Sequence, residues 1–486
     1  MLKFSWLEKM MKWLQHTHFA RVVLFLIIAL MIRAILYLVF PPFFTNDSGD
    51  YLIASEEIYN QLNFSGNGLR DWRLPGYPIF LALVRSFTIY IHNIIIIQKI
   101  LGIFSVILGF VIGYLLRSRL VSEILVLFLG LHPVYLLNEH LIMTETLFLF
   151  TLLYFSALLL FLLRGKVSLL KGFFISISLG ICVLTRANAL FFCAPLIFLA
   201  FIINLIKSGN NYNSKSSTLY FGIGLMVGAF IIFAPWFWRN YVTFGHWSLT
   251  NNTNRNLVIY QSQHNLFNPE LPQSSQFKDF YNIEQPNTIY DLIAKLGSET
   301  ARAEKIAGLL VREQINDQFS KYLEEVVISF LNFVGYSPSQ GFGRGDIYWW
   351  FISMVRDVDV LHSNNNVANA WLINTNFEYI EYGYDSWVSY FWSKAGPFFL
   401  VVVRPITFSL FLICLFVHLI TYRITIPNLQ KSAIIAFSIA YFATASLHAV
   451  SLSDYDRFVI PFNWCLWVVI SLVIEKVMRN KLTHLA

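Results

Sequence analysis

Residues 141–163 read LIMTETLFLFTLLYFSALLLFLL, and Glu145 is the only charged side chain among them. A helix needs about 20 predominantly apolar residues to cross the hydrocarbon core of a bilayer. Only helices and closed barrels can span lipid, because every backbone polar group must be satisfied internally, and the strands of a barrel alternate in polarity. A run this long and this continuously apolar therefore predicts a membrane-spanning helix.

Similar apolar runs recur along the chain, and the composition agrees with them. Hydrophobic residues make up 56% of the 486 residues and charged residues 13%, against about 25% in an average soluble protein. The segments predicted to span are 22–40, 93–116, 121–137, 141–163, 170–184, 189–206, 219–238, 397–420, 432–448 and 458–474. The sequence thus predicts an all-α polytopic membrane protein, a single domain over residues 1–486 with about ten transmembrane helices.

Basic residues indicate the orientation, because Lys and Arg accumulate in short cytoplasmic loops. If the N-terminus is inside, the basic segments that alternate along the chain are all inside as well. They are 117–119, 164–171, 207–215, 423–431 and 476–481. The net charge of +7 is explained in this way, so we expect membrane lipids and no nucleic acid as partners.

Two polar segments then face outward, a first outer loop over 41–92 and a large outer loop over 239–395. This arrangement requires that 77–91, which follows a proline and contains Arg85, lies on the outer surface as an interfacial helix. Within the large outer loop, the spacing of apolar residues predicts an amphipathic helix over 292–330.

The first outer loop contains two nearby carboxylates in the sequence TNDSGDY, residues 45–51. Asp47 and Asp50 are one helical turn apart, so in a helix they share a face. Two close carboxylates titrate as a coupled pair, and one of them can serve as a base near neutral pH. The alternative is that Asp47 is the N-cap and Asp50 the N3 residue of a helix.

A second motif in this loop, Arg73-Leu74-Pro75-Gly76-Tyr77-Pro78, predicts a rigid turn, or simply the junction of a loop with a helix. Ionisable residues within or beside apolar runs are costly and mark function by default. They are Arg33, Lys99, Glu145, Arg186, Arg404 and Arg457.

Each of these ionisable residues has a structural alternative. For Arg33 and Arg404 it is a buried ion pair with a carboxylate, and Lys99 is expected to reach the headgroups. For Arg186 and Arg457, binding and anchoring at the membrane interface remain open. Carboxylates and arginines on one face together suggest a site for an anionic ligand.

No cofactor is expected from the sequence. It lacks the HExxH, P-loop, GxSxG and CxxC motifs, and Cys182, Cys193, Cys414 and Cys465 have no metal-site spacing. We expect no metal site, although a divalent ion held by Asp47 and Asp50 is an alternative. Primary active transport by this chain is disfavoured because no ATP site is evident.

The order of these motifs resembles the GT-C glycosyltransferases, in particular bacterial proteins similar to protein O-mannosyltransferases and to the aminoarabinose transferase of lipid A. The residues that carry the resemblance are Asp47, Ser48 and Tyr51, then Pro75 to Pro78, Thr144-Glu145, Pro235-Trp236, Arg239-Asn240-Tyr241, Phe244-Gly245, Arg457-Phe458 and Pro461. The chain departs from the family in that no Glu follows Asp47, and we expect no C-terminal soluble domain.

The resemblance implies a GT-C-like bundle with interfacial helices and a multi-pass location in the cell membrane, the bacterial inner membrane, with the active face periplasmic or extracellular. It implies sugar transfer from a polyprenyl-phosphate donor to a lipid, glycan or protein acceptor, with inversion. Asp47 would be the general base, with Asp50 as its rival. The substrate-binding residues would be Tyr51, Arg73, Tyr77, Glu145, Arg186, Arg239 and Arg457.

Two other functions stay open. An O-antigen-type polymerase or ligase also acts on lipid-linked sugars, but its key residues are expected in a late outer loop. A lipid or sugar flippase or transporter is expected to have inverted repeats and helices broken near the middle of the membrane. Neither feature is clear in the sequence.

Overall fold

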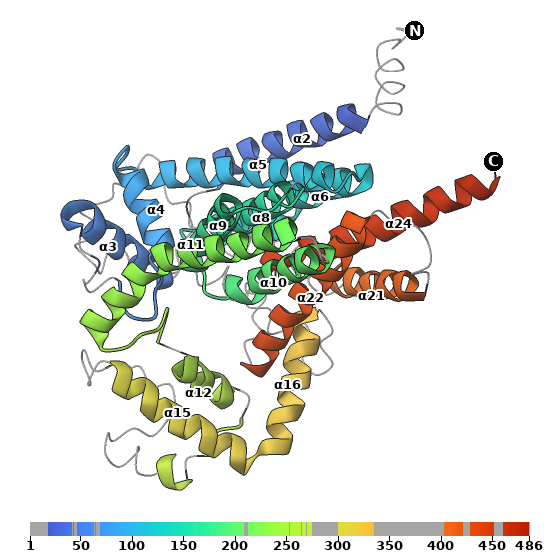
Figure 1. Ribbon diagram of the computed structural model, residues 1–486. Coiled ribbons are helices and arrows are strands. Elements are labelled where there is room, and N and C mark those ends of the chain that lie inside the picture. The colour runs from blue at the N-terminus through green and yellow to red at the C-terminus, as the bar shows by residue number, and fades with distance from the viewer. Residues whose placement is uncertain are drawn as a thin grey trace.

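The computed structural model describes residues 18–40, 42, 46–62, 64, 69–164, 166–208, 212–251, 253–263, 265–268, 270–274, 300–334, 403–420, 428–451 and 460–485. Every regular element within these ranges is a helix (Figure 1). Arg457 and most of the second half of the large outer loop lie outside them. The predicted all-α class is therefore confirmed for the part of the chain that is described.

Five of the described helices are long and apolar enough to cross a membrane. They are α2 (His18–Val39), α5 (Ile91–Leu115), α8 (Glu145–Leu162), α11 (Tyr212–Phe244) and α22 (Asn428–Val450). Shorter apolar helices accompany them: α4 (Gly76–Arg85), α9 (Leu169–Thr185), α10 (Ala189–Ser208) and α21 (Arg404–Ile420). Apolar helices of this length are what a membrane protein requires.

Close contact of two backbones joins α9 to α11. A Cβ on Gly172 would overlap the carbonyl oxygen of Phe221, and one on Gly224 would overlap that of Leu169. A Cβ on Gly228 would lie 2.8 Å from the carbonyl oxygen of Phe173. Small residues four apart let membrane helices approach in this way, where packing has to replace the hydrophobic effect.

The predicted span 121–137 is not one helix. It is divided into α6 (Arg119–Leu131) and α7 (Pro133–Asn138), with His132 in an extended conformation between them. Pro133 has no N–H to donate to the preceding turn, so helix carbonyls are left there without their usual partners. Arg33 of α2 donates to two of these carbonyls, those of Leu129 and Gly130.

The same arginine forms a buried ion pair, as predicted, and the carboxylate is Glu139. Arg33 Nη2 lies 2.7 Å from a Glu139 carboxylate oxygen, and both side chains are 2% exposed. Gly102 of α5 makes room for the pair, since a Cβ there would overlap Glu139. Lys99 was expected to reach the headgroups. Instead its side chain is buried, and its Nζ lies 2.7 Å from His140 Nε2.

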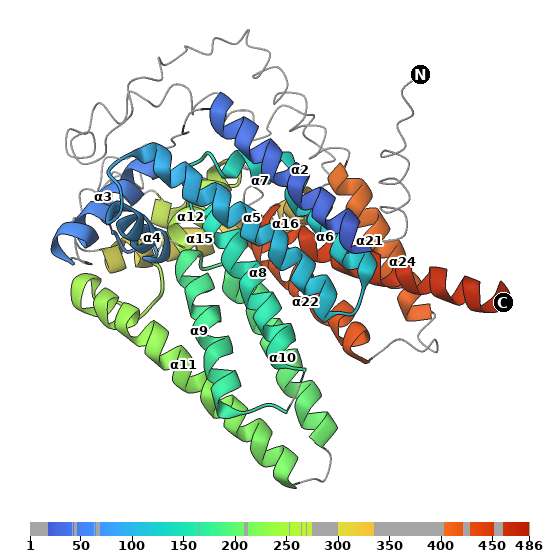
Figure 2. The same ribbon diagram turned by 90° about the horizontal axis from the view of Figure 1, so that it is seen from above.

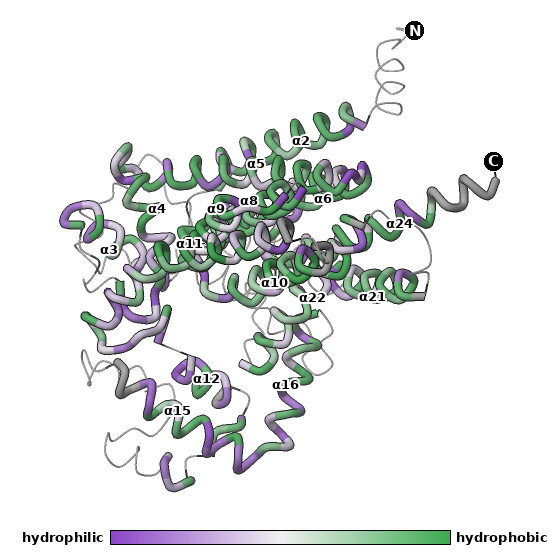
Figure 3. The backbone as a smooth tube through the Cα atoms, viewed as in Figure 1, coloured by the Kyte–Doolittle hydropathy of each residue, from purple (hydrophilic) through white to green (hydrophobic). Residues whose placement is uncertain are grey.

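Three polar helices lie outside the apolar bundle, α3 (Asn46–Gln61), α12 (Thr253–Gln263) and α15 (Thr300–Asp317), and the amphipathic helix α16 (Phe319–Val334) follows α15 (Figure 1). Figure 3 shows more hydrophilic residues in α12 and α15 than in the bundle helices. In Figures 1 and 2, α3 and α4 lie at one end of the bundle, and the start of α2 and the end of α24 (Trp464–Leu485) lie at the other.

The predicted helix 292–330 is wrong as a single element. Residues 292–299 lie outside the described part, and the remainder forms α15 and α16, which are separated at Gln318. Arg404 donates to the carbonyls of Asn332 and Phe333 at the C-terminal end of α16, where helix carbonyls need donors.

Candidate functional site

Arg73 bridges the two aspartates of the first outer loop. Its Nη2 lies 2.6 Å from Asp47 Oδ1 and 3.1 Å from Asp50 Oδ2. The aspartates share a face of α3, and Arg73 precedes α4, so the turn before α4 brings the cation back to α3. The side chains of Asp47 and Asp50 are 30% and 39% exposed, which leaves both carboxylates accessible from solvent.

The capping alternative for Asp47 does not describe the structure. Helix α3 begins at Asn46, so Asp47 lies inside its first turn and Asp50 one turn further along. A carboxylate in the first turn still benefits from the positive end of the helix dipole. The side chain is thus placed by the helix and remains available to Arg73.

Two buried tyrosines lie behind Arg73. Arg73 Nη1 donates to the Tyr51 hydroxyl at 3.3 Å, and the guanidinium carbon lies 4.9 Å from the Tyr51 ring centre. Tyr51 meets Tyr77 edge-on, with ring centres 5.2 Å apart. The Tyr77 hydroxyl donates to Gln98 Oε1 at 2.9 Å, and Gln98 donates to the carbonyls of Glu139 and Leu141.

Electrostatics reinforce the charge of Arg73. Burial alone would lower the pKa of its guanidinium, but the carboxylates of Asp47 and Asp50 help to raise that pKa well above its usual range. Burial raises the pKa of the Tyr51 hydroxyl, while the positive charge of Arg73 opposes this shift. The arginine therefore stays charged and the tyrosine stays protonated at neutral pH.

A second ion pair adjoins this cluster. Glu145 at the start of α8 is almost fully buried, and its Oε1 lies 3.0 Å from Arg186 Nη1, which follows α9. Both charges act on the pKa of the Tyr51 hydroxyl, on which the charges of Arg73 and Asp47 also act. Ser48 of α3 donates to the carbonyl of Ile142, so α3 is tied to the segment just before α8.

The structure thus brings together seven of the nine predicted site residues. They are Asp47, Asp50, Tyr51, Arg73, Tyr77, Glu145 and Arg186. Arg457 lies outside the described residues. Gln98 was missed, because a glutamine within an apolar run gives no sign of the hydroxyl that it will bind.

Arg239 does not join the cluster. It donates to the carbonyls of Phe64 and Leu69, and its guanidinium carbon lies 4.6 Å from the Trp236 ring centre. These contacts attach the middle of the first outer loop to the end of α11. Its described contacts are those of a scaffold residue for the loop that carries Arg73.

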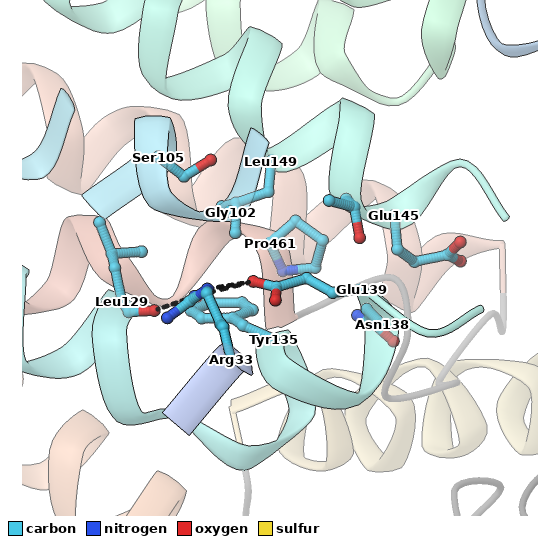
Figure 4. A pocket seen from close by; sticks show the side chains of 11 residues that line it. Arg33, Gly102, Ser105, Leu129, Tyr135, Asn138, Glu139, Glu145, Leu149 and Pro461 are labelled. Carbon is cyan, nitrogen blue, oxygen red and sulfur yellow. Dashed lines mark hydrogen bonds and ion pairs between the residues drawn. The ribbon is translucent and has the colours of Figure 1, made fainter. Parts of the chain in front are cut away.

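A small cavity lies between the Arg33–Glu139 ion pair and Glu145 (Figure 4). Asn138, Thr146 and Pro461 contribute to its wall. It has room for about one water molecule. The cavity separates the ion pair within the bundle from the acidic residue of the candidate site.

No group of three or more His, Cys, Asp or Glu side chains able to hold a metal ion occurs among the residues that the structure describes. The place between Asp47 and Asp50, where a divalent ion would sit, contains the Arg73 guanidinium.

No protein-family model matches the chain, and no curated protein sequence is significantly similar to it.

Proposed function

We propose that this chain is a membrane glycosyltransferase that moves a sugar from a polyprenyl-phosphate donor to an acceptor hydroxyl. The observation that supports this most directly is the contact of Arg73 with both Asp47 and Asp50 on an accessible face of α3. The contact unites a candidate base and a candidate phosphate ligand in one place.

Binding of the donor would redistribute the charges around Arg73. A guanidinium binds phosphate through paired, charge-assisted hydrogen bonds, so the donor phosphate competes with the aspartates for Arg73. Once Arg73 turns to the phosphate, the Asp47 carboxylate can accept a proton. The base then becomes available only when the donor is in place.

The transfer itself would be a single displacement. The acceptor oxygen attacks the anomeric carbon as its proton passes to Asp47, and the bond from that carbon to the phosphate oxygen breaks. The electrons of that bond leave with the polyprenyl phosphate. Attack opposite the leaving group inverts the anomeric centre, and Asp50 is the alternative base.

Arg186 is the candidate for a second contact with the phosphate. Glu145 holds it from a position that is almost fully buried, while the Arg186 side chain is 13% exposed. A positioned cation stabilises the negative charge that develops on a departing phosphate. Tyr51 and Tyr77, which lie behind Arg73, are further candidates for substrate binding, as is Arg457.

The proposal includes a GT-C-like bundle of about ten transmembrane helices in the bacterial inner membrane, with α3 and α4 at the periplasmic or extracellular face. A lipid-linked donor has to be handled at the edge of the bilayer, which is where interfacial helices lie. The acceptor is a lipid, a glycan or a protein.

One observation favours a transporter as the second candidate. The break between α6 and α7 interrupts an apolar run, and broken helices are typical of transporters. An O-antigen-type polymerase or ligase is the third candidate, with key residues expected in the large outer loop. The position of the aspartates in the first outer loop favours the transferase over both.

The test is a transfer assay with the purified chain in nanodiscs. Short-chain polyprenyl-phosphate sugars carrying different labelled hexoses or pentoses are added with membrane lipid and glycan acceptors, in the absence of any ion gradient. We expect labelled product from one donor and its loss with Asp47→Asn. Gradient-dependent movement of the lipid across vesicles without any product would support the transporter instead.

A further inference from the structure

Asp71 joins the two outer segments of the chain. It belongs to the first outer loop and is fully buried, and its Oδ2 lies 3.1 Å from Arg255 Nη2 on α12. The backbone N–H of Asn251 donates to the Asp71 carbonyl at 3.1 Å. His246 Nε2 lies 3.7 Å from the same carboxylate oxygen. The large outer loop therefore holds Asp71 through both its backbone and its side chain.

The next residue enters the core of the outer helices. Trp72 packs against the apolar cluster of α12 and α15 formed by Val258, Ala307 and Leu310. The guanidinium carbon of Arg255 lies 5.3 Å from the Trp72 ring centre. Asp71 and Trp72 are thus bound to α12 and α15, whereas the following residue, Arg73, turns back to Asp47 on α3.

Arg255 is itself fixed by α15. Its Nε donates to Glu304 Oε2 at 3.3 Å, and the same carboxylate accepts the backbone N–H of Asn254 at 2.7 Å. Glu304 therefore holds the N-terminal turn of α12 as well as the arginine. Arg255 is 2% exposed, and the Asp71 carboxylate that it contacts is fully buried. If the charge of Arg255 were removed, His246 would be the remaining described ion-pair partner of this carboxylate.

We propose that Asp71 and Arg255 are positioning residues, which set the place of Arg73 and so connect the outer helices α12 and α15 to the pair of aspartates. This inference rests on the proposed function for its consequence in catalysis. The three residues Asp71, Trp72 and Arg73 act as a short rigid link. A displacement of α12 relative to α3 moves the guanidinium away from Asp47 and from the phosphate that it would bind.

The experiment compares Arg255→Met, Asp71→Asn and the double variant with the wild-type chain in nanodiscs. Hydrogen exchange of the peptide over residues 69–74 reports the rigidity of the link. Glu313→Gln is the matched control, because Glu313 of α15 likewise accepts backbone N–H groups, those of Gln273 and Ser274, and its described contacts are with neither Asp71 nor Arg255.

We expect exchange over residues 69–74 to rise roughly tenfold in Arg255→Met and to stay unchanged in the control. The KM for the polyprenyl-phosphate donor should rise on the order of 10- to 100-fold, with a smaller change in kcat. In Arg255→Lys, the KM for the donor should rise less than in Arg255→Met, since lysine keeps the positive charge. The double variant should be no worse than Arg255→Met, because both changes break the same contact.

Unchanged exchange over 69–74 in a folded Arg255→Met protein would overturn the link between the outer helices and Arg73. If Arg255→Met does not fold, Asp71→Asn decides in the same way, since it keeps the size of the side chain. Faster exchange in the variants, together with a wild-type chain that transfers no sugar, would support the link and overturn the proposed function.

Discussion

Arg73 Nη2 lies 2.6 Å from Asp47 Oδ1, so the candidate base is paired with a cation. A carboxylate in such a pair is a poor proton acceptor until its partner moves. In the proposed reaction, the anionic donor would supply the reason for that movement. The ion pair therefore favours a reaction in which donor binding comes before activation of the acceptor.

Asp47→Asn should reduce sugar transfer by about 10²- to 10⁴-fold, because general-base catalysis contributes that much and an amide cannot take up the proton. The amide keeps the size of the carboxylate and can still accept from Arg73, so the melting temperature should change little. Asp50→Asn is the matched variant on the same face of α3 and should cost less. Full activity of both variants would move the reaction away from the first outer loop.

Activity should persist in EDTA. The Arg73 guanidinium already provides positive charge between Asp47 and Asp50, so a divalent ion would have to displace it. Initial rates before and after chelation, with metal added back, check this. A complete loss that Mg²⁺ or Mn²⁺ restores would show that the aspartates bind metal during turnover, and the assignment of the base would have to change.

Gly224→Ala should destabilise the bundle strongly, since the new Cβ would overlap the carbonyl oxygen of Leu169 and force α9 away from α11. Overpacking of this kind costs about 1–3 kcal/mol. Gly222→Ala, two residues away on the same helix, is the control, because its Cβ would lie 3.3 Å from the edge of the Phe201 ring. Thermal melting in detergent should separate the two; equal melting temperatures would contradict the close packing of α9 and α11.

Gly102→Ala should be at least as damaging, because its Cβ would overlap Glu139 and lie 3.0 Å from Arg33 Nε. Separating a buried ion pair costs about 3–5 kcal/mol. Gly49→Ala on α3 meets no heavy atom within 4 Å and should stabilise that helix by roughly 0.5–1 kcal/mol. A Gly102→Ala protein that melts like the wild type would show that the ion pair adapts without loss.

Cysteine labelling in intact cells tests the orientation. Gln273→Cys should react with an impermeant maleimide, and Lys166→Cys should react only after the membrane is opened. Both native side chains are exposed, and the four native cysteines are buried, which keeps the background low. Ser274 is a poor labelling site because it is 3% exposed. The reverse pattern of labelling would invert the predicted topology.

The sequence predicts the chemical type of the buried contacts better than their partners. An arginine within an apolar run requires acceptors, and a carboxylate was expected for both Arg33 and Arg404. Arg33 has one, whereas the described contacts of Arg404 are with backbone carbonyls. The partner of Arg33, Glu139, lies more than 100 residues away in the chain, and only the packing of α2 against α6 brings the two together. Lys99 shows the opposite case, because a buried His140 can bind an ammonium that would otherwise reach the headgroups.

The prediction of helix boundaries fails where a single residue interrupts a segment whose average composition is apolar. Residues 121–137 are apolar enough for one span, but Pro133 divides them into α6 and α7. In the candidate site, the motifs predict Asp47 and Arg73 separately, and the turn before α4 joins them. The link through Asp71 was missed, since nothing in the sequence DWR distinguishes an aspartate that faces another loop from one that faces water.

In the proposed reaction, the contacts of Arg239 would make bilayer thickness relevant to catalysis. It attaches Phe64 and Leu69 to the outer end of α11, a helix of 33 residues that is about 50 Å long. The hydrocarbon core is about 30 Å thick, which the predicted span 219–238 matches, so the polar ends of α11 extend beyond it and the depth of the helix depends on the membrane around it. Because the first outer loop is fixed to this helix, a thicker bilayer would bring the aspartates closer to the headgroups and a thinner one would raise them into water. Hydrophobic matching of a single helix would thus set the depth at which a lipid-linked sugar meets its base.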